Sequence, residues 1–121
     1  MKKLIQDFPH HLADALHIAH QASLKPAARE IRQVVITGLG GSGIGGTIVA
    51  DLMRDRCKVP IVVNKGYDLP AFVNPYTLVL VSTYSGNTEE TLSALNRADA
   101  RGAEIGIITS GGSALEYAKS K

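Results

Sequence analysis

The sequence has a single cysteine, no tryptophan, an aromatic content of only 5% and almost no surplus of charge. The lone Cys57 excludes an intramolecular disulfide and a cysteine-rich zinc site. Its 13 Lys and Arg against 11 Asp and Glu give a net charge of +2, too balanced to indicate nucleic acid or a membrane surface as the main partner. No apolar run approaches the roughly 20 residues of a membrane helix, and no secretory signal follows the two initial lysines. These absences predict a cytoplasmic protein.

The length and the composition of the chain predict one globular domain. The chain has 121 residues, of which 45% are hydrophobic and 20% are charged, so disorder is not expected. Glycine is distributed unevenly: seven of the 12 glycines fall between Gly38 and Gly66. The arrangement of residues is therefore more informative than the composition.

Residues 1–32 are predicted to form a helical arm that packs on the domain or on a partner. Apolar residues recur at three- and four-residue steps (Ile5, Phe8, Leu12, Leu16 and Ala19), and Pro9 and Pro26 are expected to interrupt the helix. Four histidines also lie here (His10, His11, His17 and His20). No carboxylate or cysteine completes a ligand set with suitable spacing, so we predict a solvated helix face and no metal site.

From residue 33 onward, strands alternate with helices. Strands are predicted at 33–37, 59–63, 77–81 and 104–109, and helices at 44–57, at 87–101 and from 113 to the end. This alternation predicts an α/β fold with a parallel sheet and right-handed crossovers. No strand follows the last helix, so we expect the sheet to be incomplete at the C-terminus, as in a fragment of a larger domain.

The first strand is followed by a glycine loop, GLGGSGIGG, at residues 38–46. Glycines let a backbone approach an anion closely, and the N–H groups at the start of the next helix favour negative charge. The pattern also satisfies G-x-G-x-x-G, but an NAD site needs an acidic residue after the second strand. Asn64 and Lys65 stand there, and Lys65 leaves NADP as an alternative. A tight turn without a ligand is the simplest alternative.

The third strand is followed by STYSGNT, at residues 82–88, directly before a helix. Hydroxyls and helix N-terminal amides satisfy phosphate oxygens without any arginine. Helix capping by Asn87 with Glu90, or by Ser85 with Thr88, explains one or two of these polar residues but does not require them all. We therefore predict a phosphate site where the two loops meet at the carboxyl edge of the sheet.

The segments GLGGSGIGG, NKGYDLPAF, STYSGNTEETL and ITSGG together resemble a sugar isomerase (SIS) domain, and in particular the bifunctional phosphoglucose/phosphomannose isomerase family. The resemblance implies that residues 33–121 are part of a first SIS domain, an open parallel sheet with helices on both faces and flavodoxin-like winding. It implies phosphate contacts from Gly41, Ser42, Thr83, Ser85 and Thr88. Family patterns usually have Ser where this sequence has Thr83, and the hydroxyl is retained.

The resemblance also implies a reaction, the interconversion of glucose 6-phosphate or mannose 6-phosphate with fructose 6-phosphate, without a cofactor. The family's catalytic base and a supporting Arg lie further along, so the catalytic residues are expected beyond residue 121 and this chain alone is expected to be inactive. The partners implied are a sugar phosphate and a second SIS domain or a second copy in a homodimer. Possible substrate-lining residues are Gly40, Tyr67, Asn87 and Glu89.

Alternatives remain at this point. Glu89 and Glu90 have a structural explanation, because acidic residues in a first helical turn favour the helix dipole. A phosphosugar-sensing module of a transcription regulator needs a basic DNA-binding helix pair, which residues 1–32 do not provide. An NAD(P)-binding domain leaves the 82–88 hydroxyls unexplained. An enzyme acting on aminosugar phosphates has the same domain and is not separated by this sequence.

Overall fold

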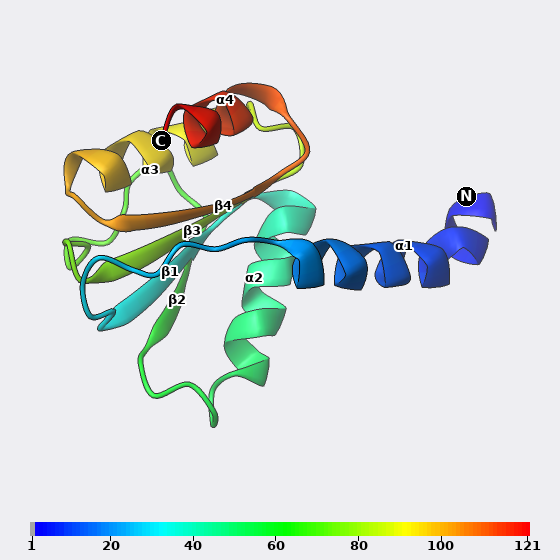
Figure 1. Ribbon diagram of the computed structural model, residues 1–121, viewed down its shortest axis with the longest axis horizontal. Helices are drawn as coiled ribbons and strands as arrows, with labels where there is room; N and C mark the ends of the chain where they lie inside the picture. Colours follow the sequence, from blue (N-terminus) through cyan, green and yellow to red (C-terminus); the bar gives the residue numbers. More distant parts are fainter. Residues whose placement is uncertain (1) are drawn as a thin grey trace.

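The computed structural model describes residues 2–121, which form a four-stranded parallel sheet with helices on both faces and one projecting helix (Figure 1). The elements in chain order are α1 (Lys2–Gln21), β1 (Gln33–Thr37), α2 (Gly40–Leu52), β2 (Ile61–Asn64), β3 (Thr77–Thr83), α3 (Glu89–Ala100), β4 (Glu104–Thr109) and α4 (Gly112–Ser120). The predicted α/β class and the positions of all four strands are confirmed. α3 and α4 begin and end within two residues of their expected bounds, whereas α2 begins at Gly40 instead of residue 44 and ends at Leu52 instead of residue 57.

The strand order is β2-β1-β3-β4, and every neighbouring pair is parallel. Because right-handed crossovers run in opposite directions from β1 to β2 and from β3 to β4, α2 covers one face of the sheet and α3 and α4 cover the other (Figure 1). This is the flavodoxin-like winding that the resemblance to SIS domains implies. The order reverses between β1 and β3, which places a crevice at their carboxyl ends.

The core lies between the sheet and α3. Val35, Val79 and Val81 from the central strands pack with Leu95 of α3, and all four are at most 2% exposed. β1 reads QVVIT and is buried on both faces beyond its first residue, as expected of a β-branched run in a parallel sheet. The central strands are therefore rigid supports for the loops that follow them.

The connection from β2 to β3 has no helix, and it covers β1 on the α3 face instead. Leu69 and Val73 of this connection are 5% and 4% exposed and belong to the core. Its backbone is fixed to α3 by the guanidinium of Arg101, which donates to the Pro70 carbonyl oxygen at 2.7 Å. The connection is therefore a packed part of the domain, although its sequence predicts only a loop.

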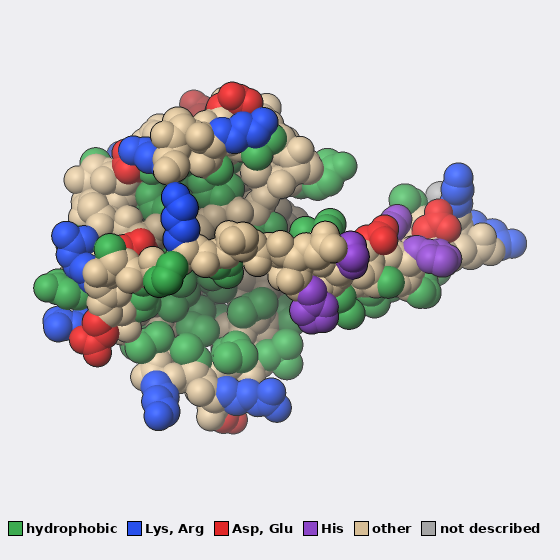
Figure 2. Space-filling view, viewed as in Figure 1, with side chains coloured by type: hydrophobic (Ala, Val, Ile, Leu, Met, Phe, Trp, Pro, Cys, Tyr) green, Lys and Arg blue, Asp and Glu red, His purple; other side chains and the backbone are tan. Residues whose placement is uncertain are grey.

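The N-terminal arm differs from its prediction in two respects. α1 runs through Pro9 without a break, whereas the sequence analysis placed a break there, and residues 22–32 have no regular secondary structure, whereas a helix was expected. Pro9 removes one backbone donor, but α1 is exposed to water, which can satisfy the carbonyl oxygen of Ile5. None of the described residues of α1 is buried, so the arm does not pack on this domain (Figure 2).

No helix among residues 2–121 is long and apolar enough to cross a membrane.

Candidate functional site

The glycine loop and the hydroxyl loop follow β1 and β3, which are hydrogen-bonded neighbours at the point where the strand order reverses. Both loops therefore begin at the same edge of the sheet. They also touch at their first residues. A Cβ on Gly38 would lie 2.8 Å from the carbonyl oxygen of Ser82, so no side chain fits between the two loops. The glycine at this position keeps the two loops together at the crevice.

The glycine loop leads directly into α2, which begins at Gly40. No side chain caps this helix, and a Cβ on Gly41 would meet nothing within 4 Å. Gly41 is exposed and Ser42 is half-buried. The first turn of α2 thus presents backbone N–H groups beside open space, which is the arrangement that suits an anion.

The hydroxyl loop is organised around Thr83, which is 4% exposed. Its Oγ1 accepts a hydrogen bond from the backbone N–H of Gly86 at 3.2 Å and lies 3.4 Å from Oγ1 of Thr88. Ser85 is exposed, and its Oγ accepts from the N–H of Asn87 at 3.1 Å. Two of the three predicted phosphate-binding hydroxyls in this loop, those of Thr83 and Thr88, therefore lie together. Thr88 precedes α3 without capping it through its side chain.

Asn87 does not cap α3 either. Its Oδ1 accepts from the backbone N–H of Ser113 at 2.9 Å, in the first turn of α4. The loop after β4 thus braces the hydroxyl loop, an arrangement that the sequence analysis missed. Gly86 is part of this contact, with φ at +74°, and a Cβ there would collide with the carbonyl oxygen of Gly111. The sequence signal that could have indicated this contact is the ITSGG segment, which begins at the end of β4.

Tyr67 and Glu89 come from separate elements and meet at the start of α3. The Tyr67 phenol donates to Oε2 of Glu89 at 3.2 Å, and both residues are exposed. Desolvation, followed by the negative charges of Glu89 and Glu90, raises the pKa of the Tyr67 phenol above its usual value. Next to this pair, Asp68 forms an ion pair with Arg97 at 2.9 Å. The β2–β3 connection is thus tied along one side of α3.

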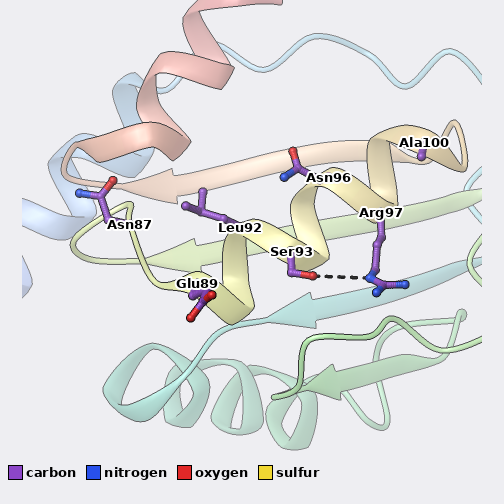
Figure 3. Close-up of a pocket in the computed structure, with 7 residues that line it drawn as sticks. All are labelled: Asn87, Glu89, Leu92, Ser93, Asn96, Arg97 and Ala100. Atoms are coloured by element: carbon purple, nitrogen blue, oxygen red, sulfur yellow. Dashed lines mark hydrogen bonds between the residues drawn. The ribbon is translucent and has the colours of Figure 1, made fainter.

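An open hollow of about 600 Å³ lies on the outer side of α3 (Figure 3). It includes Asn87 and Glu89 at one end, and it continues along the helix to Ala100. Of the nine residues predicted for the site, only these two line it. The hollow therefore runs beside the loops and does not coincide with the crevice between β1 and β3.

The four histidines are exposed on α1, the helix that projects from the domain (Figure 2). Within residues 2–121, no three His, Cys, Asp or Glu side chains are grouped so that they can hold a metal ion. Hydroxyls, backbone amides, carboxylates and the ammonium of Lys65 all occur at the carboxyl edge of the sheet.

Comparison with known proteins finds a solved structure with the same fold and relatives that are similar in sequence. A protein of Clostridium difficile described as a phosphosugar isomerase matches with a TM-score of 0.79 over 94% of this chain and 34% of that chain, at 19% identity. The bifunctional phosphoglucose/phosphomannose isomerase of Caldicellulosiruptor bescii is 47% identical over 119 residues, which cover 98% of this chain and 35% of that protein. The chain has the SIS fold and resembles the bifunctional phosphoglucose/phosphomannose isomerases over nearly its whole length.

A second relative of this chain is the D-glucosamine-6-phosphate 4-epimerase of Sulfolobus acidocaldarius. It is 36% identical over 97 residues, which cover 79% of this chain and 30% of that protein. No family model matches the chain. The chain spans about a third of the length of the curated relatives it matches.

Proposed function

We propose that this chain is the phosphosugar-binding domain of an aldose–ketose isomerase that acts on glucose 6-phosphate or mannose 6-phosphate and fructose 6-phosphate. The main support is the convergence of the glycine loop and the hydroxyl loop at the β1–β3 crevice, where Gly38 contacts Ser82. The relatives named for phosphoglucose and phosphomannose isomerisation support the sugar. In this proposal Gly41, Ser42, Thr83, Ser85 and Thr88 hold the phosphate group.

Binding is tested by NMR on the ¹⁵N-labelled chain. Glucose 6-phosphate and fructose 6-phosphate are expected to shift the amide resonances of residues 41–42 and 83–88, because the phosphate accepts hydrogen bonds from these loops. Unphosphorylated glucose is the matched control and should shift them little. Unchanged resonances with excess sugar phosphate would contradict the proposal.

The chain on its own is expected to show no isomerase turnover. Moving a proton between C1 and C2 needs a base within hydrogen-bond reach, and Glu89, the carboxylate that directly follows the hydroxyl loop, accepts a hydrogen bond from Tyr67. The measurement is a coupled assay for fructose 6-phosphate with the purified chain. Turnover that is lost in Glu89→Gln would instead identify Glu89 as the base.

A second candidate ligand is an aminosugar phosphate, which the 36% identity to a D-glucosamine-6-phosphate 4-epimerase favours. A cation at C2 of the sugar would be attracted by Glu89 and Glu90 in the first turn of α3. Parallel titrations with glucosamine 6-phosphate and with glucose 6-phosphate show which ligand binds more tightly. This candidate would be favoured if the amino sugar phosphate binds more tightly and this advantage is lost in the double variant Glu89→Gln with Glu90→Gln.

Association with a second copy or a second domain of the same kind is part of the proposal. Exposed apolar side chains on α1 and α2 support it, including Leu12, Leu16, Ile44 and Ile48. Light scattering on the purified chain measures its oligomeric state, and a strictly monomeric chain would contradict the homodimer.

A further inference from the structure

The basic residues of the sheet domain gather at one end of the sheet, away from the two loops. In parallel α/β winding, helices return to the amino edge, so cations late in a helix or just before a strand lie at that edge. Arg54, Arg56 and Lys58 precede β2, Arg97 and Arg101 lie at the end of α3, and Lys119 and Lys121 lie at the end of α4. Among residues 33–121, only Lys65 directly follows a strand and so lies at the carboxyl edge.

Lys65 comes immediately after Asn64, the last residue of β2, and its side chain lies against the first turn of α2. Its Cε is 3.5 Å from the position that a Cβ on Gly43 would occupy. Gly43 is buried and has no side chain, which leaves this position to the lysine stem. Lys65 itself is exposed and forms no ion pair with any residue of the described chain. Its ammonium is therefore available to a ligand at the start of α2.

A full positive charge adds to the hydrogen bonds that the two loops can offer a phosphate. Residues 38–46 and 82–88 contain no Lys, Arg or His, while Glu89 and Glu90 stand at the same edge in the first turn of α3. A phosphate monoester is close to a dianion at neutral pH, so the two carboxylates repel it. Hydroxyls and helix amides supply hydrogen bonds but only partial positive charge.

We propose that Lys65 is the cation that holds the phosphate group of the ligand, with its ammonium placed over the first turn of α2. This proposal rests on the phosphosugar-binding function proposed above. Lys65 then acts as a point charge that complements the hydroxyls of the second loop. Electrostatic attraction of this kind weakens with added salt, which gives it a signature that a purely structural role lacks.

The test compares Lys65→Met with Lys65→Arg and with Lys58→Met. Methionine keeps the apolar stem beside Gly43 and removes the charge, arginine keeps the charge, and Lys58→Met removes the same charge at the amino edge of the sheet. Isothermal titration with glucose 6-phosphate at low salt is expected to show about a tenfold loss of affinity for Lys65→Met. Lys65→Arg and Lys58→Met should stay within about twofold of the unmodified chain.

Two further measurements identify the group that Lys65 contacts. The loss in Lys65→Met should shrink as salt rises and should be similar for inorganic phosphate, since the contact is to the phosphate group itself. A loss for glucose 6-phosphate with none for inorganic phosphate would overturn the assignment to the phosphate.

The failure of this proposal can be told apart from the failure of the proposed function. If the unmodified chain binds glucose 6-phosphate and Lys65→Met binds it equally well at low salt, the Lys65 proposal is wrong and the phosphosugar function stands. If the unmodified chain binds neither glucose 6-phosphate nor inorganic phosphate, both proposals are wrong. Thermal unfolding of each variant checks that the fold is kept.

Discussion

The side-chain oxygen of Asn87 accepts a hydrogen bond from the backbone N–H of Ser113, at 2.9 Å, and thereby joins the hydroxyl loop to the first turn of α4. A second hydrogen bond, from the N–H of Ala114 to the carbonyl oxygen of Gly86 at 3.0 Å, reinforces this junction. The segments lie more than twenty residues apart in sequence, so the geometry of the hydroxyl loop depends on the loop after the next strand.

Asn87→Ala is expected to lower the free energy of unfolding by about 1 kcal/mol, because the first turn of α4 loses its side-chain acceptor. Asn87→Asp keeps an acceptor oxygen in the same place and should retain most of the stability. Urea unfolding of both variants measures the difference. Equal stability of Asn87→Ala and the unmodified chain would show that the contact contributes nothing.

Gly38→Ala is expected to destabilise the domain by about 1–3 kcal/mol and to weaken sugar phosphate binding, because the new Cβ would lie 2.8 Å from the Ser82 carbonyl oxygen and force the two loops apart. Gly45→Ala is the matched control. Gly45 is exposed within α2 and has open space around its missing Cβ, so alanine should stabilise the chain by about 0.5–1 kcal/mol. Urea unfolding and NMR titration measure both effects, and a Gly38→Ala chain that unfolds and binds normally would refute the close approach.

Thr83→Val is expected to cost about 1–3 kcal/mol of stability and to remove phosphate binding, because the buried N–H of Gly86 loses its acceptor along with the ligand hydroxyl. Thr83→Ser keeps the hydroxyl, and it should bind glucose 6-phosphate about as well as the unmodified chain. Calorimetric titration of the two variants gives the comparison. Retained binding in Thr83→Val would remove Thr83 from the proposed site.

Tyr117 provides a pH-dependent contribution to stability. Burial, followed by the hydrogen bond that its phenol donates to Asp99 at 2.7 Å, raises the pKa of Tyr117 to about 12. Because the folded-state pKa lies above the unfolded value of about 10, the contribution is complete below pH 10 and is lost as the pH rises through about 12. Tyr117→Phe should therefore be less stable by about 0.5–1.5 kcal/mol at neutral pH and equal to the unmodified chain at high pH. Unfolding by urea across this range checks the difference, and a constant difference would contradict it.

In a sample dilute enough to be monomeric, the projecting helix α1 is expected to contribute nothing to the stability of the sheet domain. Leu12 and Leu16 are 52% and 63% exposed, so Leu12→Asp with Leu16→Asp should change the free energy of unfolding by less than about 0.5 kcal/mol. Leu95→Ala is the contrasting variant, because Leu95 is 2% exposed and its truncation should cost about 2–5 kcal/mol. A large loss in the α1 variant would show that the arm packs on the domain or a partner.

Much of the candidate site was predictable because its residues are adjacent in sequence. The glycines of 38–46 and the hydroxyls of 82–88 follow strands that the β-branched runs QVVIT and TLVLV identify, and parallel winding brings loops after neighbouring strands to one edge. The role of Asn87 was not predictable in the same way. Its sequence neighbours favour a cap on α3, while its actual partner is Ser113, which only the pairing of β3 with β4 brings close.

By itself, the sequence determined the α/β class, the strands and the two loops, since these follow from local hydrophobic periodicity and glycine placement, while the winding was implied by the resemblance to SIS domains. Only the tertiary structure decided that α1 continues through Pro9 and leaves its apolar side exposed, and that the β2–β3 connection packs as part of the core. It also decided that Lys65 lies beside Gly43 and Tyr67 beside Glu89. These contacts join residues far apart in the chain, and no local pattern of polarity or spacing encodes which distant side chain will fill a given space.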